Sequence, residues 1–451
     1  MDSNVEQFRK SFDIMLSGKL NRQKMVKSSA ATENLREGIV ARADSALLPA
    51  IQEEYSMQRP IRQWFGKATG VNCGRIGCHP DFAALEGTDK QEYHYITTMF
   101  VDIRNSTRLS LCYPLEDVQH IKNSILRVAS ETVRAMDGHV HRFMGDALMA
   151  YFGGRSQTKE TTAMAAICCS AMLRTVMHEA VVPALNAREI DAKDLGFRVG
   201  IDFGDDQEVL WSSYGFSDVN EVTATSFYVD ASAKLQSMAA KDCTMLGDNL
   251  LKLLDFPEIL TTEKKVMREG QHIGVPFLQP NYQLPSESPV NYSIRELNYE
   301  AVARLLPIPT ELKEGFAPEI VSRNGIRFFA EVIDEFGLRP YPSMSSCLPK
   351  GVTVQFNLTI DPIALKSLRL PINGRFIKQN HGHEAESYVQ VSPEIVKFSY
   401  SPEPRDLREN KSYKKRFERI TAYRGIHVVT IEIHDERGRQ VFKEAVGVHV
   451  C

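Results

Sequence analysis

The segment that decides the fold spans residues 95–107 and reads YITTMFVDIRNST. β-Branched and aromatic residues crowd its first nine positions, and this pattern predicts a buried strand over 95–103. An acid at the end of a strand can hold a divalent cation, while backbone N–H groups of a following polar loop bind phosphate oxygens. The acid here is Asp102, and the loop contains Asn105, Ser106 and Thr107.

Predicted helices and strands alternate after this segment. In chain order they are a helix over 115–135, strands over 140–143 and 147–152, a helix over 161–185 and a strand over 197–203. This alternation predicts an α/β or α+β unit of roughly 160 residues.

A second carboxylate, Asp146, lies in a Gly-Asp turn between the two short predicted strands. Two acids in one cleft would bind a pair of metal ions, an arrangement suited to phosphoryl chemistry. Taken singly, however, Asp102 and Asp146 are each typical of turn or cap carboxylates. Only the segments around them favour a metal site.

Composition narrows the class of protein. The chain has 451 residues, of which 43% are hydrophobic and 25% charged, as in ordinary folded proteins. Its net charge of −3 offers no electrostatic surface for general nucleic-acid binding. We find no secretory signal and no membrane span, and the most apolar stretch, 163–177, predicts a buried helix. Eight cysteines in so long a chain do not predict a disulfide framework, so we expect a cytoplasmic protein.

Changes in composition and in the pattern of apolar residues along the chain predict four regions. Residues 1–92 form a mainly helical N-terminal extension, and 93–275 form the α+β unit. Repeated prolines mark a linker over 276–309. Clean alternation of apolar and polar residues over 352–360, together with a terminal hairpin, predicts a β-rich sandwich over 310–451.

Taken together and in order, four segments resemble the motifs of class III nucleotidyl cyclases. They are MFVDI (99–103) with Thr107, DGHVHRFMGD (137–146), FRVGIDFG (197–204) and VDASAKL (229–235). The resemblance implies an α+β fold with a ferredoxin-like βαββαβ core, and it makes 93–275 a cyclase catalytic domain. It also implies a head-to-tail homodimer with two symmetric sites.

The resemblance assigns roles residue by residue. It implies that Asp102, Asp146 and the Ile103 carbonyl hold two ions of Mn²⁺ or Mg²⁺, while Asn105, Ser106 and Thr107 lie at the phosphates. Where the family commonly has Asn and Arg to orient the ribose and stabilise charge, this chain has Asp230 and Lys234. Lys234 keeps the positive charge but lacks the bidentate fork of arginine.

The base-selecting positions depart from both purine patterns. The family has Lys or Glu where this chain has Arg142, and Asp or Cys at the position aligned with Thr223. Arginine carries only donors, which suits the carbonyl oxygens of uracil and opposes the amine of cytosine. Arg142 is equally compatible with an ion pair or a phosphate contact.

We therefore expect UTP to be converted to 3′,5′-cyclic UMP and pyrophosphate. CTP converted to cyclic CMP is the alternative within the same chemistry, and an atypical adenylate cyclase is a third. A catalytically silent cyclase fold that only binds nucleotide is the rival from another class.

A non-purine cyclase domain joined to a β-rich module resembles the pyrimidine cyclases of bacterial Pycsar antiphage defence systems. The resemblance implies a preference for manganese, a nucleotide-sensing C-terminal domain and a cyclic nucleotide that activates a separate effector protein. A basic stretch over 411–424, interleaved with aromatic residues, could hold an anion. Such a run is more often a solvated face whose aromatic side chains enter the core.

Overall fold

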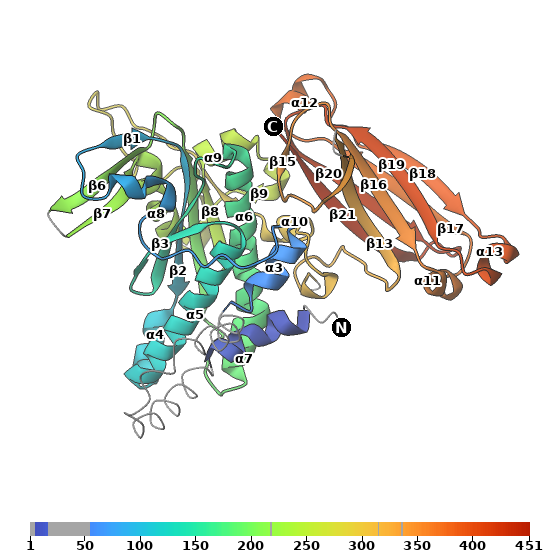
Figure 1. Ribbon diagram of the computed structural model, residues 1–451, viewed down its shortest axis with the longest axis horizontal. Coiled ribbons are helices and arrows are strands. Elements are labelled where there is room, and N and C mark those ends of the chain that lie inside the picture. Colours follow the sequence, from blue (N-terminus) through green and yellow to red (C-terminus); the bar gives the residue numbers. More distant parts are fainter. Residues whose placement is uncertain (1–4, 17–54, 217–218, 314, 335–336) are drawn as a thin grey trace, which may run out of the picture.

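The computed structural model describes residues 5–16, 55–216, 219–313, 315–334 and 337–451. A seven-stranded sheet, in the order β3-β4-β2-β5-β8-β12-β9, organises the first part of the chain (Figure 1). Its core elements are β2 (Ile96–Arg104), α5 (Leu115–Ala135), β3 (His139–Met144), β4 (Ala147–Phe152), α6 (Lys159–Val176) and β5 (Gly196–Gly204). This succession and strand order confirm the predicted ferredoxin-like βαββαβ core.

Helices α5 and α6 cover one face of this sheet. Val101 and Ile103 of β2 share a hydrophobic cluster with Ala129 of α5 and Ile167 of α6. The segment Lys159–Asn186, which continues through a π-helical turn (Met177–Val181) into α7 (Val182–Asn186), is apolar enough to cross a membrane by length and composition. Because 78% of its apolar window is buried, the prediction of a buried helix here is confirmed.

The opposite face carries helix α8 (Phe227–Met238) and a small sheet of β1 (Gln91–Tyr93), β6 (Leu210–Phe216) and β7 (Val219–Thr225). Trp211 and Val222 of the small sheet pack with Tyr151 of β4 in a second hydrophobic cluster. The side chains at alternate positions of β2 and β4 therefore enter two different cores.

Gly200 is a point of close approach between β5 and α8. A Cβ atom at this position would lie 2.2 Å from the carbonyl oxygen of Ser232 and from the backbone nitrogen of Gln236. We expect Gly200→Ala to lower the free energy of unfolding by about 2–4 kcal/mol, because backbone atoms must move apart. Thermal unfolding measures this. Gly315→Ala, where the new Cβ meets only ordinary contacts, is the control, and an equal shift in both variants would contradict the explanation.

The N-terminal region is helical only in part. A helix over residues 5–16 inserts Phe8 and Phe12 into the main core, and α3 (Gln58–Trp64) packs beside α5. The chain from 66 to 79 is irregular, and a short 3₁₀ helix (Pro80–Leu85) leads into β1. The predicted helices over residues 17–54 lie outside the described residues.

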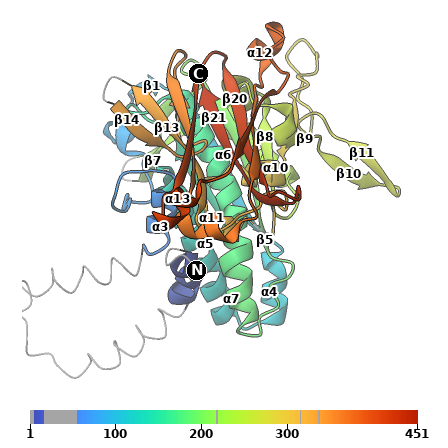
Figure 2. The same ribbon diagram turned by 90° about the vertical axis from the view of Figure 1, so that its right-hand side faces the viewer.

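Part of the predicted linker belongs to the sheet. Strand β12 (Ile294–Leu297) lies between β8 (Cys243–Gly247) and β9 (Thr261–Thr262), so the prediction of a linker is wrong for these residues. Prolines do mark an irregular backbone on either side, but the four residues of β12 contain none and pair freely. The hairpin of β10 (Lys265–Arg268) and β11 (Gln271–Gly274) projects from this edge (Figure 2).

Residues from 326 onward form the predicted all-β sandwich, seen on the right of Figure 1. One sheet has the order β14-β13-β16-β19 and the other β15-β21-β20-β17-β18, and their inner faces enclose a separate hydrophobic core. The strands are β13 (Ile326–Asp334), β14 (Gly337–Tyr341), β15 (Cys347–Leu348), β16 (Thr353–Ile360), β17 (Ile372–Gln379), β18 (Glu394–Tyr400), β19 (Tyr413–Ile420), β20 (Gly425–His434) and β21 (Gln440–Val450). Three short helices lie in the connections between these strands: α11 (Pro362–Ser367), α12 (His383–Ser387) and α13 (Pro404–Arg408).

The sandwich packs directly on the catalytic domain. Ile426, Val428 and Ala445 join the hydrophobic cluster that contains α6. At the end of α9 (Asp248–Leu254), the Asp255 carboxylate accepts a hydrogen bond of 2.8 Å from the backbone of His383. Short connecting helices, α10 (Tyr299–Ala303) and a 3₁₀ turn (Thr310–Leu312), lead from one domain to the other.

Two cysteines of the sandwich are paired. Strand β15 runs parallel to β21, which places Cys347 beside the C-terminal Cys451, and the two form a disulfide. The other six cysteines are free. The basic stretch over 411–424 forms a largely solvated strand whose Phe417 is buried in the core, as the sequence pattern favours.

Candidate active site

Asp102 and Asp146 meet at one end of the catalytic sheet. Asp102 pairs in register with Ala147, and the backbone N–H of Ile103 donates a hydrogen bond of 3.1 Å to the Asp146 carbonyl. The antiparallel pairing of β2 and β4 thus brings the strand end and the turn together. They line a polar cavity of about 410 Å³ with Ile103, Arg104, Asn105, Ser106, Thr107, Arg108, Asp194 and Arg198.

Both carboxylates have cationic or hydroxyl partners. Asp102 forms an ion pair with Arg198 of β5, which lies opposite it in the strand register. Asp146 accepts a hydrogen bond from Ser106 Oγ, and Lys122 Nζ of α5 lies 3.4 Å away. Sequence reasoning missed Arg198, although it lies in the quoted segment FRVGIDFG. The signal that could have found it is the antiparallel pairing of the two predicted strands, which places Arg198 opposite Asp102.

The donor set fits a hard divalent cation. In the described part of the chain, no three His, Cys, Asp or Glu side chains gather as a ready-made metal cage. The cavity instead offers the carboxylates of Asp102 and Asp146, together with main-chain oxygens, in an open, polar space; its third carboxylate, Asp194, is paired with Arg108. Mg²⁺ and similar ions are held in this way, by one or two carboxylates together with substrate phosphates and water.

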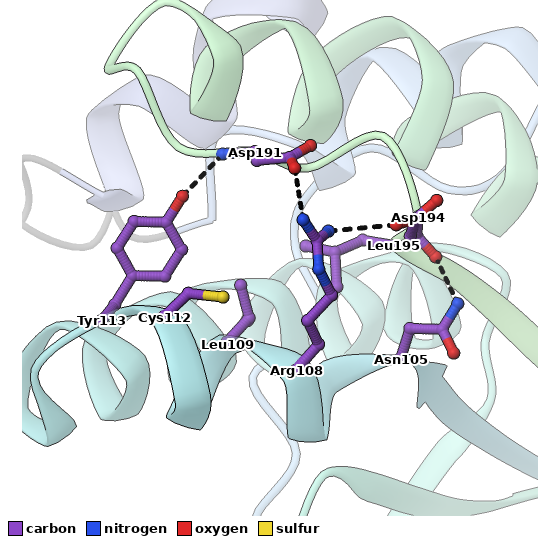
Figure 3. Close-up of a pocket in the computed structure, with 8 residues that line it drawn as sticks. All are labelled: Asn105, Arg108, Leu109, Cys112, Tyr113, Asp191, Asp194 and Leu195. Atoms are coloured by element: carbon purple, nitrogen blue, oxygen red, sulfur yellow. Dashed lines mark hydrogen bonds and ion pairs between the residues drawn. The ribbon is translucent and has the colours of Figure 1, made fainter.

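The loop after Asp102 is tied down by its neighbours, as Figure 3 shows. Asn105 has the left-handed φ of 63° and donates from Nδ2 to the Asp194 carbonyl at 3.0 Å. Arg108 of α4 (Ser106–Cys112) reaches both Asp191 and Asp194. Of the three predicted phosphate contacts, the Asn105 amide and the Ser106 hydroxyl already have protein partners, while Thr107 is exposed at the cavity.

The two predicted base-binding residues lie together elsewhere. Arg142 of β3 forms an ion pair with Glu221 of β7, and Thr223 stands two residues farther on the same strand, hence on the same face. Tyr151 Oη lies 3.3 Å from Thr223 Oγ1. Glu221 is a second residue that sequence reasoning missed, because the hairpin of β6 and β7 brings it to Arg142 from far along the chain.

Asp230 and Lys234 form a third location, on α8. Asp230 is exposed in the first turn of the helix, and Lys234 Nζ lies 5.7 Å from the ring centre of Tyr282. The cavity around Asp102 is lined by no residue of α8, β3 or β7. The predicted site residues therefore lie at three places within one chain: the metal group at the cavity, Arg142 and Thr223 beside Glu221, and Asp230 and Lys234 on α8. Arg142, Thr223, Asp230 and Lys234, which all lie outside the cavity, are together called the base and ribose group.

A ferredoxin-like core with one aspartate at the end of its first strand, and another in the turn between its second and third strands, is the arrangement that the resemblance to class III nucleotidyl cyclases implies. Comparison with solved structures gives the adenylyl cyclase CyaB from P. aeruginosa (22% identity, TM-score 0.37, 46% of this chain and 95% of that one). It also gives the guanylyl cyclase Cya2 (16% identity, TM-score 0.36, 46% and 93%).

Sequence relatives extend over both domains. Two cytidylate cyclases from Escherichia coli are each 35% identical, one over 88% of both chains and the other over 84% of this chain and 80% of its own. A cytidylate cyclase from Staphylococcus aureus is 30% identical over 90% of this chain and 88% of its own. Residues 310–451 match the Adenylyl/Guanylyl and SMODS C-terminal sensor domain. The chain belongs to the pyrimidine nucleotidyl cyclase family.

Proposed function

We propose that this enzyme converts CTP to 3′,5′-cyclic CMP and pyrophosphate. The observation that carries the proposal is the similarity to cytidylate cyclases over 80–90% of their length and of this chain. The proposal replaces UTP, the substrate expected from the donor-only character of Arg142. That expectation considered Arg142 alone, whereas its guanidinium is paired with the Glu221 carboxylate, an acceptor that suits an amine.

Asp102, Asp146 and the Ile103 carbonyl would hold two divalent cations, for which we propose Mn²⁺ or Mg²⁺. When bound, such ions neutralise triphosphate charge and promote attack of the ribose 3′-oxygen on the α-phosphorus. Arg198 supplies a further positive charge in the same cavity. The exposed Thr107 and the backbone of the loop over 105–107 are the groups we assign to the phosphates.

We propose a head-to-tail homodimer in which each site combines the metal group of one subunit with the base and ribose group of the other. The support is the separation of these groups within one chain. Helix α8 lies along the sheet with Ser232 against Gly200, and Lys234 is directed at Tyr282 instead of the cavity. In the dimer, Lys234 would stabilise charge on the transferring phosphate, and Asp230 would contact the ribose.

We further propose that the product is a second messenger of antiphage defence, made in the cytoplasm and read by a separate effector protein. The support is the resemblance of the domain combination to Pycsar cyclases. The C-terminal domain is proposed to respond to a nucleotide. The hydrophobic cluster that its residues share with α6, and its hydrogen bond to the end of α9, are the contacts through which we propose that such binding reaches the catalytic sheet.

Turnover of four nucleotides tests the proposed reaction. Purified full-length protein receives ATP, GTP, CTP or UTP with Mn²⁺, and products are resolved by chromatography. We expect cyclic CMP to exceed each of the other products by at least about tenfold. Cyclic UMP as the main product would restore the substrate expected from Arg142 alone. No product from any nucleotide would favour the catalytically silent binding module.

A further inference from the structure

Arg142 and Glu221 form a donor–acceptor pair at the surface of the base and ribose group. Their side chains are 38% and 45% exposed, so the pair is accessible at its outer edge. Glu221 and Thr223 share one face of β7, and the buried Tyr151 closes the space beside Thr223. A planar base that meets this surface encounters a carboxylate acceptor next to a guanidinium donor.

His141 holds the guanidinium in place. Its Nδ1 donates to the Gly77 carbonyl at 3.0 Å, since a carbonyl can only accept, and its Nε2 therefore accepts from Arg142 at 3.0 Å. Burial lowers the pKa of His141 to about 4, so this neutral tautomer persists at physiological pH. The imidazole is buried, so it orients Arg142 and has no exposed surface for contact with a substrate.

We infer that the Arg142–Glu221 pair reads the edge of cytosine, with Glu221 as the residue that distinguishes cytosine from uracil. Glu221 accepts from the N4 amine, while Arg142 donates to the neighbouring ring nitrogen or the O2 carbonyl. Uracil in the same position places its O4 carbonyl against the carboxylate, so two acceptors face each other. His141 is a positioning residue for Arg142. This inference rests on the proposed function and deepens it to a single side chain.

Product ratio tests the role of Glu221. Wild-type and Glu221→Gln enzymes receive equal concentrations of CTP and UTP with Mn²⁺, and cyclic CMP and cyclic UMP are measured together. The glutamine amide keeps the shape of glutamate but can turn its NH₂ toward O4. We expect the ratio of cyclic CMP to cyclic UMP to fall by about tenfold or more, whereas Glu86→Gln, an exposed carboxylate outside the cluster, leaves it unchanged.

A substrate analogue provides a test that needs no variant. Pyrimidin-2-one riboside triphosphate lacks the N4 amine, and we expect the wild-type enzyme to use it with kcat/KM about tenfold below that for CTP. The difference should shrink in Glu221→Gln, which tests the pairing directly.

His141→Phe should reduce the CTP-to-UTP preference more than it reduces total turnover, a split that general loss of structure would not cause.

The outcomes separate the two proposals. A wild-type preference for CTP with an unchanged ratio in Glu221→Gln and full use of the analogue would overturn the role of Glu221 and leave the proposed function standing. A wild-type preference for UTP would overturn both. If Glu221→Gln does not fold, as circular dichroism would report, the analogue result decides alone.

Discussion

Asp102→Asn and Asp146→Asn are each expected to lower kcat for cyclic nucleotide formation by at least about a hundredfold. Both carboxylates open into the 410 Å³ cavity, and the asparagine amide keeps their size while removing the charge that attracts a divalent cation. The Arg198 and Lys122 cations beside them would then be uncompensated and would further repel a metal ion. Product formation at saturating Mn²⁺ measures the loss.

Asp89→Asn is the matched control, because Asp89 is an exposed carboxylate outside the cavity. Its turnover should equal that of the wild type. Circular dichroism and thermal unfolding establish that each variant folds. Full turnover in both Asp102→Asn and Asp146→Asn would show that the proposed assignment of the metal ions is wrong. If the wild-type protein binds nucleotide but forms no product, the catalytically silent module is favoured instead.

Mixing two inactive variants is expected to restore activity. Asp102→Asn disables the metal group and Lys234→Ala disables the base and ribose group, each by about a hundredfold. In a hybrid dimer, the intact metal group of one subunit faces the intact Lys234 of the other, so one of the two sites works. Random pairing makes about half of the dimers hybrids, which gives about a quarter of the wild-type activity.

Asp102→Asn mixed with Asp146→Asn is the matched control. Both changes lie in the metal group, so neither site of that hybrid is intact and activity should stay at the level of the single variants. Co-expression of differently tagged chains, with hybrids isolated through both tags, ensures that subunits have mixed. Isolated hybrids of Asp102→Asn and Lys234→Ala without activity would overturn the shared site.

Local patterns in the sequence were sufficient for the catalytic core. A run of β-branched and aromatic residues predicted the buried strand over 95–103 that contains Asp102. Apolar residues at helical spacing predicted α5, and the apolar stretch over 163–177 predicted the buried α6. The glycine before Asp146 indicated the turn. The sandwich followed in the same way from the alternation over 352–360. The places of Asp102 and Asp146 in the fold were therefore predictable before any tertiary contact was known.

Contacts between distant segments required the tertiary structure. Arg198 meets Asp102 across 96 residues only because β2 and β5 pair antiparallel in one register. Glu221 reaches Arg142 because a hairpin folds over the sheet, and β12 enters the sheet from a proline-rich stretch that resembled a linker. Short-range periodicity reports which face of an element is buried, but it carries no information on which partner the element meets. The sequence by itself determined the core and the places of its two aspartates, while the tertiary structure decided which charges stand beside them and what faces Arg142.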